Sequence, residues 1–156
     1  GGFSPPDSSR SLSPKRSTAP QPPGPGFPVH ATSLGKVLLA FQPDEVVEAY
    51  LASAELKRFT ERTITSREEF KKRLKKVRLD GYDSALDELD YGIVSVAVPI
   101  FDRDRKVASA INCSTSTTRI SQDELVRTRL PLLRSAAHEI QAALTKRPYL
   151  AHSLIG

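Results

Sequence analysis

The sequence of 156 residues has a formal net charge of +5 and 38% hydrophobic residues, which suits one domain with a hydrophobic core. A single cysteine excludes an internal disulfide, and no apolar run approaches the roughly 18 residues of a membrane-spanning helix. Because no secretory signal is recognisable either, we expect a cytoplasmic protein.

The first 29 residues differ in composition from the rest of the chain, because they hold 8 of the 12 prolines and 4 of the 8 glycines. Such a segment buries too little apolar surface to offset the entropy of ordering it. Residues 1–29 are therefore predicted to be a disordered Pro/Ser-rich segment. We expect the folded domain over residues 30–147 and a C-terminal tail over residues 148–156.

Three helices, each with one apolar side, are predicted before residue 81. Either Thr32 or Ser33 can cap the first, LGKVLLAF, and Pro43 begins the second, DEVVEAYLAS. Ser66, with a glutamate three residues later, forms a capping box for the third helix, and Gly81 ends it.

The stretch from Gly92 to Arg119 is predicted to form a β-hairpin, preceded by a short strand over residues 82–86. The turn of the hairpin holds five consecutive charged residues, DRDRK. Alternate residues of each strand face opposite sides, and both sides are mostly apolar. We therefore expect the hairpin at the centre of a mostly antiparallel sheet with helices against it, an α+β fold.

A second capping box, Ser121 to Glu124, predicts the start of a long last helix. Pro131 is expected to kink or break it. Its apolar residues step by four and three positions and form one seam for packing: Val126, Leu130, Leu133, Ala137, Ile140 and Leu144.

Few residues of the sequence suit metal binding or catalysis. The soft metal ligands are His30, Cys113, His138 and His152, whose spacing matches no zinc site, so we expect neither a metal nor a cofactor. Cys113 could act as the nucleophile of a thiol hydrolase with His30 as its base, but its strand position is more typical of a small core residue.

Two charged stretches have a functional and a simpler interpretation. The helix carrying Lys71 to Arg78 could bind nucleic acid without sequence specificity, although such a charge run is usually a solvated face. Asp87, Glu88 and Asp90 could act as paired carboxylates, but we interpret them as solvated acids of a turn.

The start of the first helix, Ser33-Leu34-Gly35-Lys36, is the most informative candidate site. Backbone N–H groups at a helix N-terminus, with a hydroxyl and a glycine beside them, can receive a carboxylate or a phosphate. An ordinary capped helix start is an equally good interpretation of this stretch alone. If the hairpin faces this turn, then Ser95, Asn112 and Ser114 converge on it, and the sequence predicts a site for a small organic acid.

Three motifs carry a family resemblance: HATSLGKVLLAF, LDGYDSALDELDYGIVSVAVPIFD and VASAINCSTSTTRIS. With them the sequence resembles the effector-binding domain of IclR-family transcriptional regulators, from about Phe27 to Leu144. Within that family it looks like the branch that responds to protocatechuate, 4-hydroxybenzoate or β-ketoadipate.

The resemblance implies a GAF-like (profilin-like) domain that binds a small organic acid and is not an enzyme. It also implies a dimer or tetramer whose winged helix-turn-helix modules bind operator DNA. Carried over by position, the pocket would use Ser33 and Leu34 in the turn, with Ser95, Asn112 and Ser114 on the strands. An aspartate of the family pattern falls on Ala85.

Two departures from the family accompany this resemblance. The winged-helix module would precede this sequence and is absent from it. The helix and first strands that normally open the effector domain are missing or replaced by the Pro/Ser-rich segment of residues 1–29. Our hypothesis is that this segment is a mis-read or truncated start.

Overall fold

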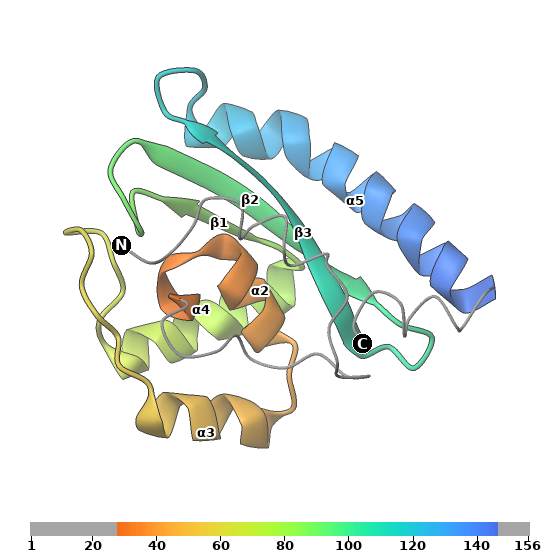
Figure 1. Cartoon of the computed structure of the whole chain (residues 1–156), viewed down its shortest axis with the longest axis horizontal. Helices are drawn as coiled ribbons and strands as arrows, with labels where there is room; N and C mark the ends of the chain where they lie inside the picture. Colours follow the sequence, from red (N-terminus) through yellow and green to blue (C-terminus); the bar gives the residue numbers. More distant parts are fainter. Residues whose placement is uncertain (1–27, 147–156) are drawn as a thin grey trace.

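The computed structural model describes residues 28–146, in which helices precede a hairpin and a long helix follows it (Figure 1). The predicted disordered segment, apart from residues 28 and 29, and the predicted tail lie outside the described residues. The elements are η1 (Val29–Ala31), α2 (Ser33–Ala40), α3 (Asp44–Ser53), α4 (Arg67–Asp80), β1 (Asp83–Leu86), β2 (Ile93–Phe101), β3 (Val107–Ser116) and α5 (Gln122–Lys146).

The strands form one antiparallel sheet in the order β1-β2-β3, with helices on both faces (Figure 1). Helix α5 runs along one face, and α2 packs on the other with α3 and α4 beyond it. The α+β prediction and the antiparallel hairpin with helices on both faces are therefore confirmed, but only β2 is central, because β3 is an edge strand of the sheet. None of the helices within residues 28–146 combines the length and the apolar composition needed to cross a membrane.

Two apolar clusters, one on each face, hold these layers together. The cluster under α5 consists mainly of valines from β2 and the seam of α5, with these fully buried members: Val94, Val96, Val98, Ile100, Ala108, Leu125, Leu130, Ala137 and Leu144. The other cluster joins α2, α3 and α4 to Ala97 and Ala110 of the sheet. Alternation along the strands separates the two clusters, as the sequence pattern predicted.

Local signals set most helix boundaries as expected. Ser66 caps α4 by accepting a hydrogen bond from the N–H of Glu69 at 3.2 Å, and Gly81 ends the helix with a left-handed φ of 80°. The hydroxyl of Ser121 accepts a bond from the N–H of Glu124 at the start of α5. These contacts span only three or four residues, which is why the sequence predicts them well.

Four details differ from the sequence interpretation. Helix α5 continues through Pro131, so of the expected kink or break the break does not occur, and Pro43 is the cap of α3 rather than its first residue. An irregularity between Ile100 and Phe101 places Ala108 under α5, against strict alternation. Val29, expected at the end of the disordered segment, is a core residue with 1% exposure.

Candidate functional site

The candidate site is built on the first turn of α2. Thr32 caps this helix, and its Oγ1 accepts a hydrogen bond from the N–H of Gly35 at 3.1 Å. A Cβ on Gly35 would lie 2.7 Å from both the Cα of Val29 and Oγ1 of Thr32, so only glycine lets the turn pack this closely on η1. The turn is therefore fixed, and with it the first residue of α2, Ser33.

Ser33 meets the sheet at Ser95, where the two hydroxyl oxygens are 2.7 Å apart. Ser114 lies opposite Ser95 on β3, and Asn112 lies opposite Ala97 in the next position along the same face. We call Ser33, Ser95, Asn112 and Ser114 the polar row. The structure thus places the four predicted polar residues on the α2 side of the sheet.

The polar row is graded in exposure. Ser33 and Ser95 are 1% and 8% exposed, Asn112 is half-buried and Ser114 is exposed. Two hydroxyl groups carry two protons, of which their mutual hydrogen bond uses one. The buried pair therefore carries one hydroxyl proton beyond their mutual hydrogen bond, and the row ends at the exposed Ser114.

The other two predicted residues contribute through the backbone or through packing. Leu34 is 4% exposed and its side chain belongs to the α2-side cluster, so only its backbone can face a ligand. The N–H of Gly35 already donates to Thr32, which leaves the amides of Ser33 and Leu34 as the first-turn donors without an acceptor earlier in the helix. Ala85, opposite Ser95 on β1, adds a buried methyl to the row.

Lys36, in the first turn of α2, belongs to a buried group of charged residues that the sequence analysis missed. Nζ of Lys36 is 2.7 Å from Oε1 of Glu88 and 3.4 Å from Oδ2 of Asp83. Arg73 completes the group from α4, with Nε 2.8 Å from Asp83 and Nη2 3.0 Å from Glu88. We call these four residues the charge cluster; its formal charges balance.

Burial and the neighbouring charges both shift pKa values in the charge cluster. The pKa of Asp83 is raised because burial penalises its carboxylate, even though Lys36 and Arg73 favour the charged form. Burial also acts to lower the pKa of Arg73, but the carboxylates of Asp83 and Glu88 outweigh it and the pKa is raised. The two cations therefore do not fully offset the burial of Asp83, whereas the two carboxylates more than offset the burial of Arg73.

The sequence did contain signals for the charge cluster. Lys36 is the one charged residue of the apolar segment LGKVLLAF and is fully buried. Arg73 lies between Phe70 and Val77 on the buried side of α4. The interpretation of the acidic loop as solvated is wrong for Glu88, which is 7% exposed.

A groove of about 440 Å³ lies elsewhere, between α4 and the start of α5 at the outer side of β1. Three cations line it, and each faces a carboxylate: Arg73 contacts Asp83, Lys76 contacts Asp80, and Arg127 lies 3.8 Å from Glu124. The groove is separate from the polar row. Because its cations already contact carboxylates, fewer of their N–H donors are available to a ligand.

The thiol-hydrolase alternative is wrong in its geometry. Cys113 packs against the cluster under α5, on one face of the sheet. His30 lies on the other face, where its ring is tilted against Phe59 and edge-on to Phe70, and its Nε2 bonds to the carbonyl of Lys57 at 2.7 Å. The two residues cannot form a nucleophile–base pair across the sheet.

The basic helix also has a structural explanation. Several of its cations contact carboxylates, including Lys71 with Glu48 at 2.6 Å and Arg78 with Asp44 at 3.2 Å. The guanidinium of Arg78 also donates to carbonyls at the end of α2. Paired cations contribute less to phosphate binding than free ones, which weighs against the nucleic-acid alternative.

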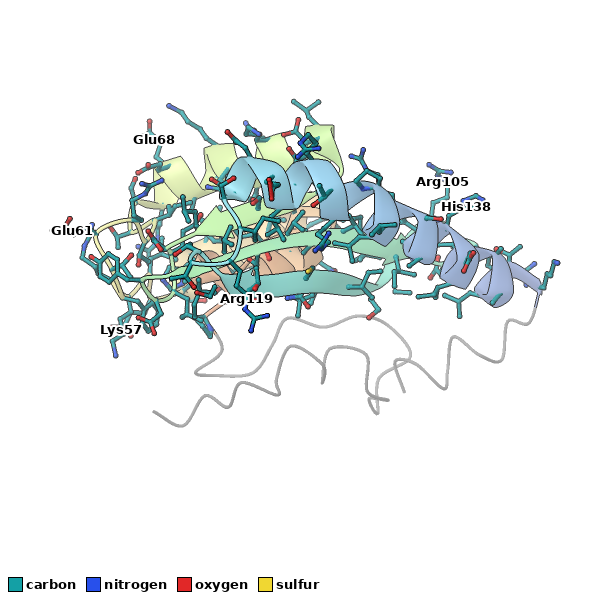
Figure 2. The ribbon with its side chains drawn as sticks, turned by 90° about the horizontal axis from the view of Figure 1, so that it is seen from above. Lys57, Glu61, Glu68, Arg105, Arg119 and His138 are labelled. Atoms are coloured by element: carbon teal, nitrogen blue, oxygen red, sulfur yellow. The ribbon has the colours of Figure 1, made fainter. Side chains whose placement is uncertain are left out.

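Metal binding finds no support within residues 28–146. No group of three or more histidine, cysteine or acidic residues has the arrangement of a metal site there. Figure 2 shows His138 far from Lys57, which marks the end of the molecule where His30 is bonded. His152 lies outside the described residues.

Comparisons with known proteins identify the family of this chain. The model of the family "Bacterial transcriptional regulator IclR C-terminal" matches residues 9–142, so the match begins inside the predicted disordered segment. The p-hydroxybenzoate hydroxylase transcriptional activator of Acinetobacter baylyi is 36% identical over 115 residues, which are 74% of this chain and 42% of that protein. The chain thus spans about two fifths of this curated relative.

Solved structures of similar chains share the fold. A transcriptional regulator from Rhodococcus sp. RHA1 is 40% identical with a TM-score of 0.74, covering 77% of this chain and 49% of that one. The inducer-binding domain of the transcription factor PobR from Acinetobacter, a double mutant in complex with 3-hydroxybenzoic acid, is 36% identical with a TM-score of 0.71. That comparison covers 76% of this chain and 69% of the other.

Proposed function

This chain belongs to the IclR family of bacterial transcriptional regulators and corresponds to their effector-binding domain, and from this premise we propose that it senses a small aromatic or dicarboxylic acid. The acid would bind at the polar row, with its carboxylate at the first turn of α2. Ser33, Leu34 and Ser95 would supply the inner donors, and Asn112 and Ser114 the outer ones.

The observation that carries this proposal is the contact between Ser33 and Ser95. Two buried hydroxyls, 2.7 Å apart, join the N-terminus of a helix to the middle of a strand. The positive end of the helix dipole favours an anion at this place, and the hydroxyl pair has a donor to offer it.

The donors of this site and its apolar surface are sufficient for a ligand of micromolar affinity. Charge-assisted hydrogen bonds contribute about 1.5–3 kcal/mol each, so three of them with modest apolar burial reach the roughly 8 kcal/mol of a micromolar complex. Ile93, 40% exposed and two residues before Ser95 on the same face, offers apolar surface for an aromatic ring. The 3-hydroxybenzoic acid bound by the PobR inducer-binding domain supports an aromatic acid as the first candidate, as does the name of the p-hydroxybenzoate hydroxylase activator.

The regulatory step would be a coupling between this site and operator DNA. We propose that the acid changes how protomers associate in a dimer or tetramer, and that winged-helix modules read this change. A coupling free energy of about 1–3 kcal/mol would suffice for a 5- to 150-fold change in operator affinity. This chain would contact DNA only through such a module.

Titration of the chain with p-hydroxybenzoate, 3-hydroxybenzoate and a dicarboxylate series tests the ligand site. At 100 times its Kd, an acid that binds the folded state should raise the free energy of unfolding by about 2.7 kcal/mol. The double variant S33A/S95A removes both hydroxyls together, so no buried hydroxyl loses its partner and the unliganded fold should change little.

We expect S33A/S95A to weaken acid binding at least tenfold in isothermal titration calorimetry. The variant S53A is the matched control, because it deletes an exposed serine of α3 away from the polar row. Equal affinity of S33A/S95A and S53A for an acid that binds the wild type would overturn the proposed site.

A further inference from the structure

The side chain of Lys36 has an unusual position for a lysine. It is fully buried, and its ammonium group lies within hydrogen-bonding distance of two backbone carbonyls of the segment before α2. Nζ is 3.3 Å from the carbonyl oxygen of Thr32 and 3.5 Å from that of His30. The same ammonium group contacts Glu88 at 2.7 Å and Asp83 at 3.4 Å.

These contacts join the candidate binding turn to the sheet edge. Thr32 and His30 belong to the turn that presents Ser33, whereas Asp83 is on β1 and Glu88 is in the loop that follows it. An ammonium has three protons and a flexible stem, so it can bridge carbonyls and carboxylates that no single backbone bond connects. Lys36 is the residue that makes this bridge.

A buried lysine is an expensive way to add stability alone. Taking an ammonium and its carboxylates out of water costs several kcal/mol per ion, and apolar replacement of such pairs is often neutral or stabilising. The α2-side cluster already anchors the helix through Leu34, Val37 and Leu39. The carbonyl contacts of Lys36 therefore point to a role in the position of the turn.

We propose that Lys36 is a positioning residue for the acid-binding turn, held by its hydrogen bond to Glu88 and acting through the carbonyls of His30 and Thr32. It does not touch the ligand itself. This inference deepens the proposed function, on which its ligand-binding part rests. Arg73 has a different part: it neutralises the remaining carboxylate charge from α4, and its hydrogen bonds go to Asp83, Ser84 and Glu88 rather than to the turn.

Two charge-balanced double variants of the whole chain separate these roles. K36M/E88Q removes the bridge together with one carboxylate charge, and leaves Arg73 paired with Asp83. R73M/D83N is the matched control, because it removes the other cation and carboxylate but leaves Lys36 with Glu88 and both carbonyls. Each variant keeps the cluster neutral, which limits unfolding through an unpaired buried charge.

The first readout is amide hydrogen exchange, which needs no ligand. The amides of Gly35 and residue 36 bond to the side chain and carbonyl of Thr32, so their exchange reports the turn. We expect exchange there to become at least tenfold faster in K36M/E88Q, with α5 amides unchanged. In R73M/D83N the turn should exchange within threefold of the wild type.

The second readout is the Kd for p-hydroxybenzoate and 3-hydroxybenzoate. We expect K36M/E88Q to bind at least tenfold more weakly at a melting temperature close to that of R73M/D83N, whose affinity should stay within threefold of wild type. Unchanged exchange in K36M/E88Q, or faster exchange with unchanged affinity, would overturn the positioning role, as would equal effects of both variants. If the wild type binds neither acid, the proposed function fails for these acids, and the exchange comparison still decides the role of Lys36.

Discussion

The two faces of the central sheet are built from alternate residues of the same strands, yet they differ in chemistry. The face under α5 presents Val94, Val96 and Val98 to an apolar seam. The face under α2 presents Ser95, and its buried surroundings include a lysine and two carboxylates. One face can be explained by packing alone, whereas the other holds polar groups that packing does not require.

This difference separates stability from recognition within one domain. Apolar burial contributes about 25 cal/mol per Å² without directional requirements, so the α5 face tolerates exchange of one apolar side chain for another of similar volume. Buried polar groups are directional, and each depends on a specific partner. Changes on the α5 face should therefore alter folding, and changes on the α2 face should alter binding.

The largest expected effect comes from the α5 face. Leu125 is 1% exposed in the cluster under α5, and Leu125→Ala should lower the free energy of unfolding by about 2–5 kcal/mol because it leaves a cavity. Urea denaturation measures this loss. Under conditions where the variant is folded, acid affinity should remain within threefold of wild type, and an affinity loss as large as that of S33A/S95A would show that the faces are not independent.

An intermediate effect is expected at the turn of α2, where both properties should change. Alanine normally improves a helix by about 1 kcal/mol over glycine, but the added Cβ of Gly35→Ala would lie 2.7 Å from backbone of η1. Overpacking of this kind costs about 1–3 kcal/mol, so we expect net destabilisation.

The displaced turn of Gly35→Ala should also weaken acid binding beyond its effect on stability. Thermal unfolding and calorimetric titration of the same sample measure the two effects. A variant more stable than the wild type, with normal binding, would mean that the turn can move away from η1 freely.

The smallest effect should appear in the pH dependence of the α2 side. Burial lowers the pKa of His30 below its ordinary value of 6.5, a shift that the bond to Lys57 only partly offsets and the charge of Lys36 adds to. The folded state then binds fewer protons than the unfolded state, so the contribution of His30 is present above pH 6.5 and is lost as the pH falls through its lowered pKa. We expect the free energy of unfolding to fall between pH 7 and 5 for this reason.

The variant H30Q isolates this contribution, because an amide can still donate to the carbonyl of Lys57 but does not titrate. Asp83, whose pKa is raised by burial, acts in the opposite direction: its contribution is present at low pH and lost as the pH rises through its raised pKa. Comparing wild type with H30Q removes that shared contribution. Parallel stability curves for the two proteins from pH 7 to 5 would contradict the assignment to His30.

The contact between Ser33 and Ser95, on which the proposed site rests, could be predicted only on the condition that the hairpin faces the start of α2. Residue types marked both the turn at Ser33 and the small polar group at Ser95, and the resemblance to IclR-family effector domains joined them. That they touch is now observed, whereas their role in binding an acid stays a prediction. Gly35 was selected as the glycine of this turn, and the structure shows why no side chain fits there: the turn packs closely on η1.

The sequence by itself determined the helices and strands, because caps, turns and apolar periodicity act over a few residues. Ser66, for example, caps the start of α4, and Gly81 ends that helix. The sequence could not determine the charge cluster, since Lys36 and Glu88 are 52 positions apart and both are of residue types that are usually exposed to solvent. Only the packing of α2 and α4 on β1 removed water from these groups and forced them to pair. Burial, which depends on the whole fold, converted residues that look like surface charges into the support of the candidate site.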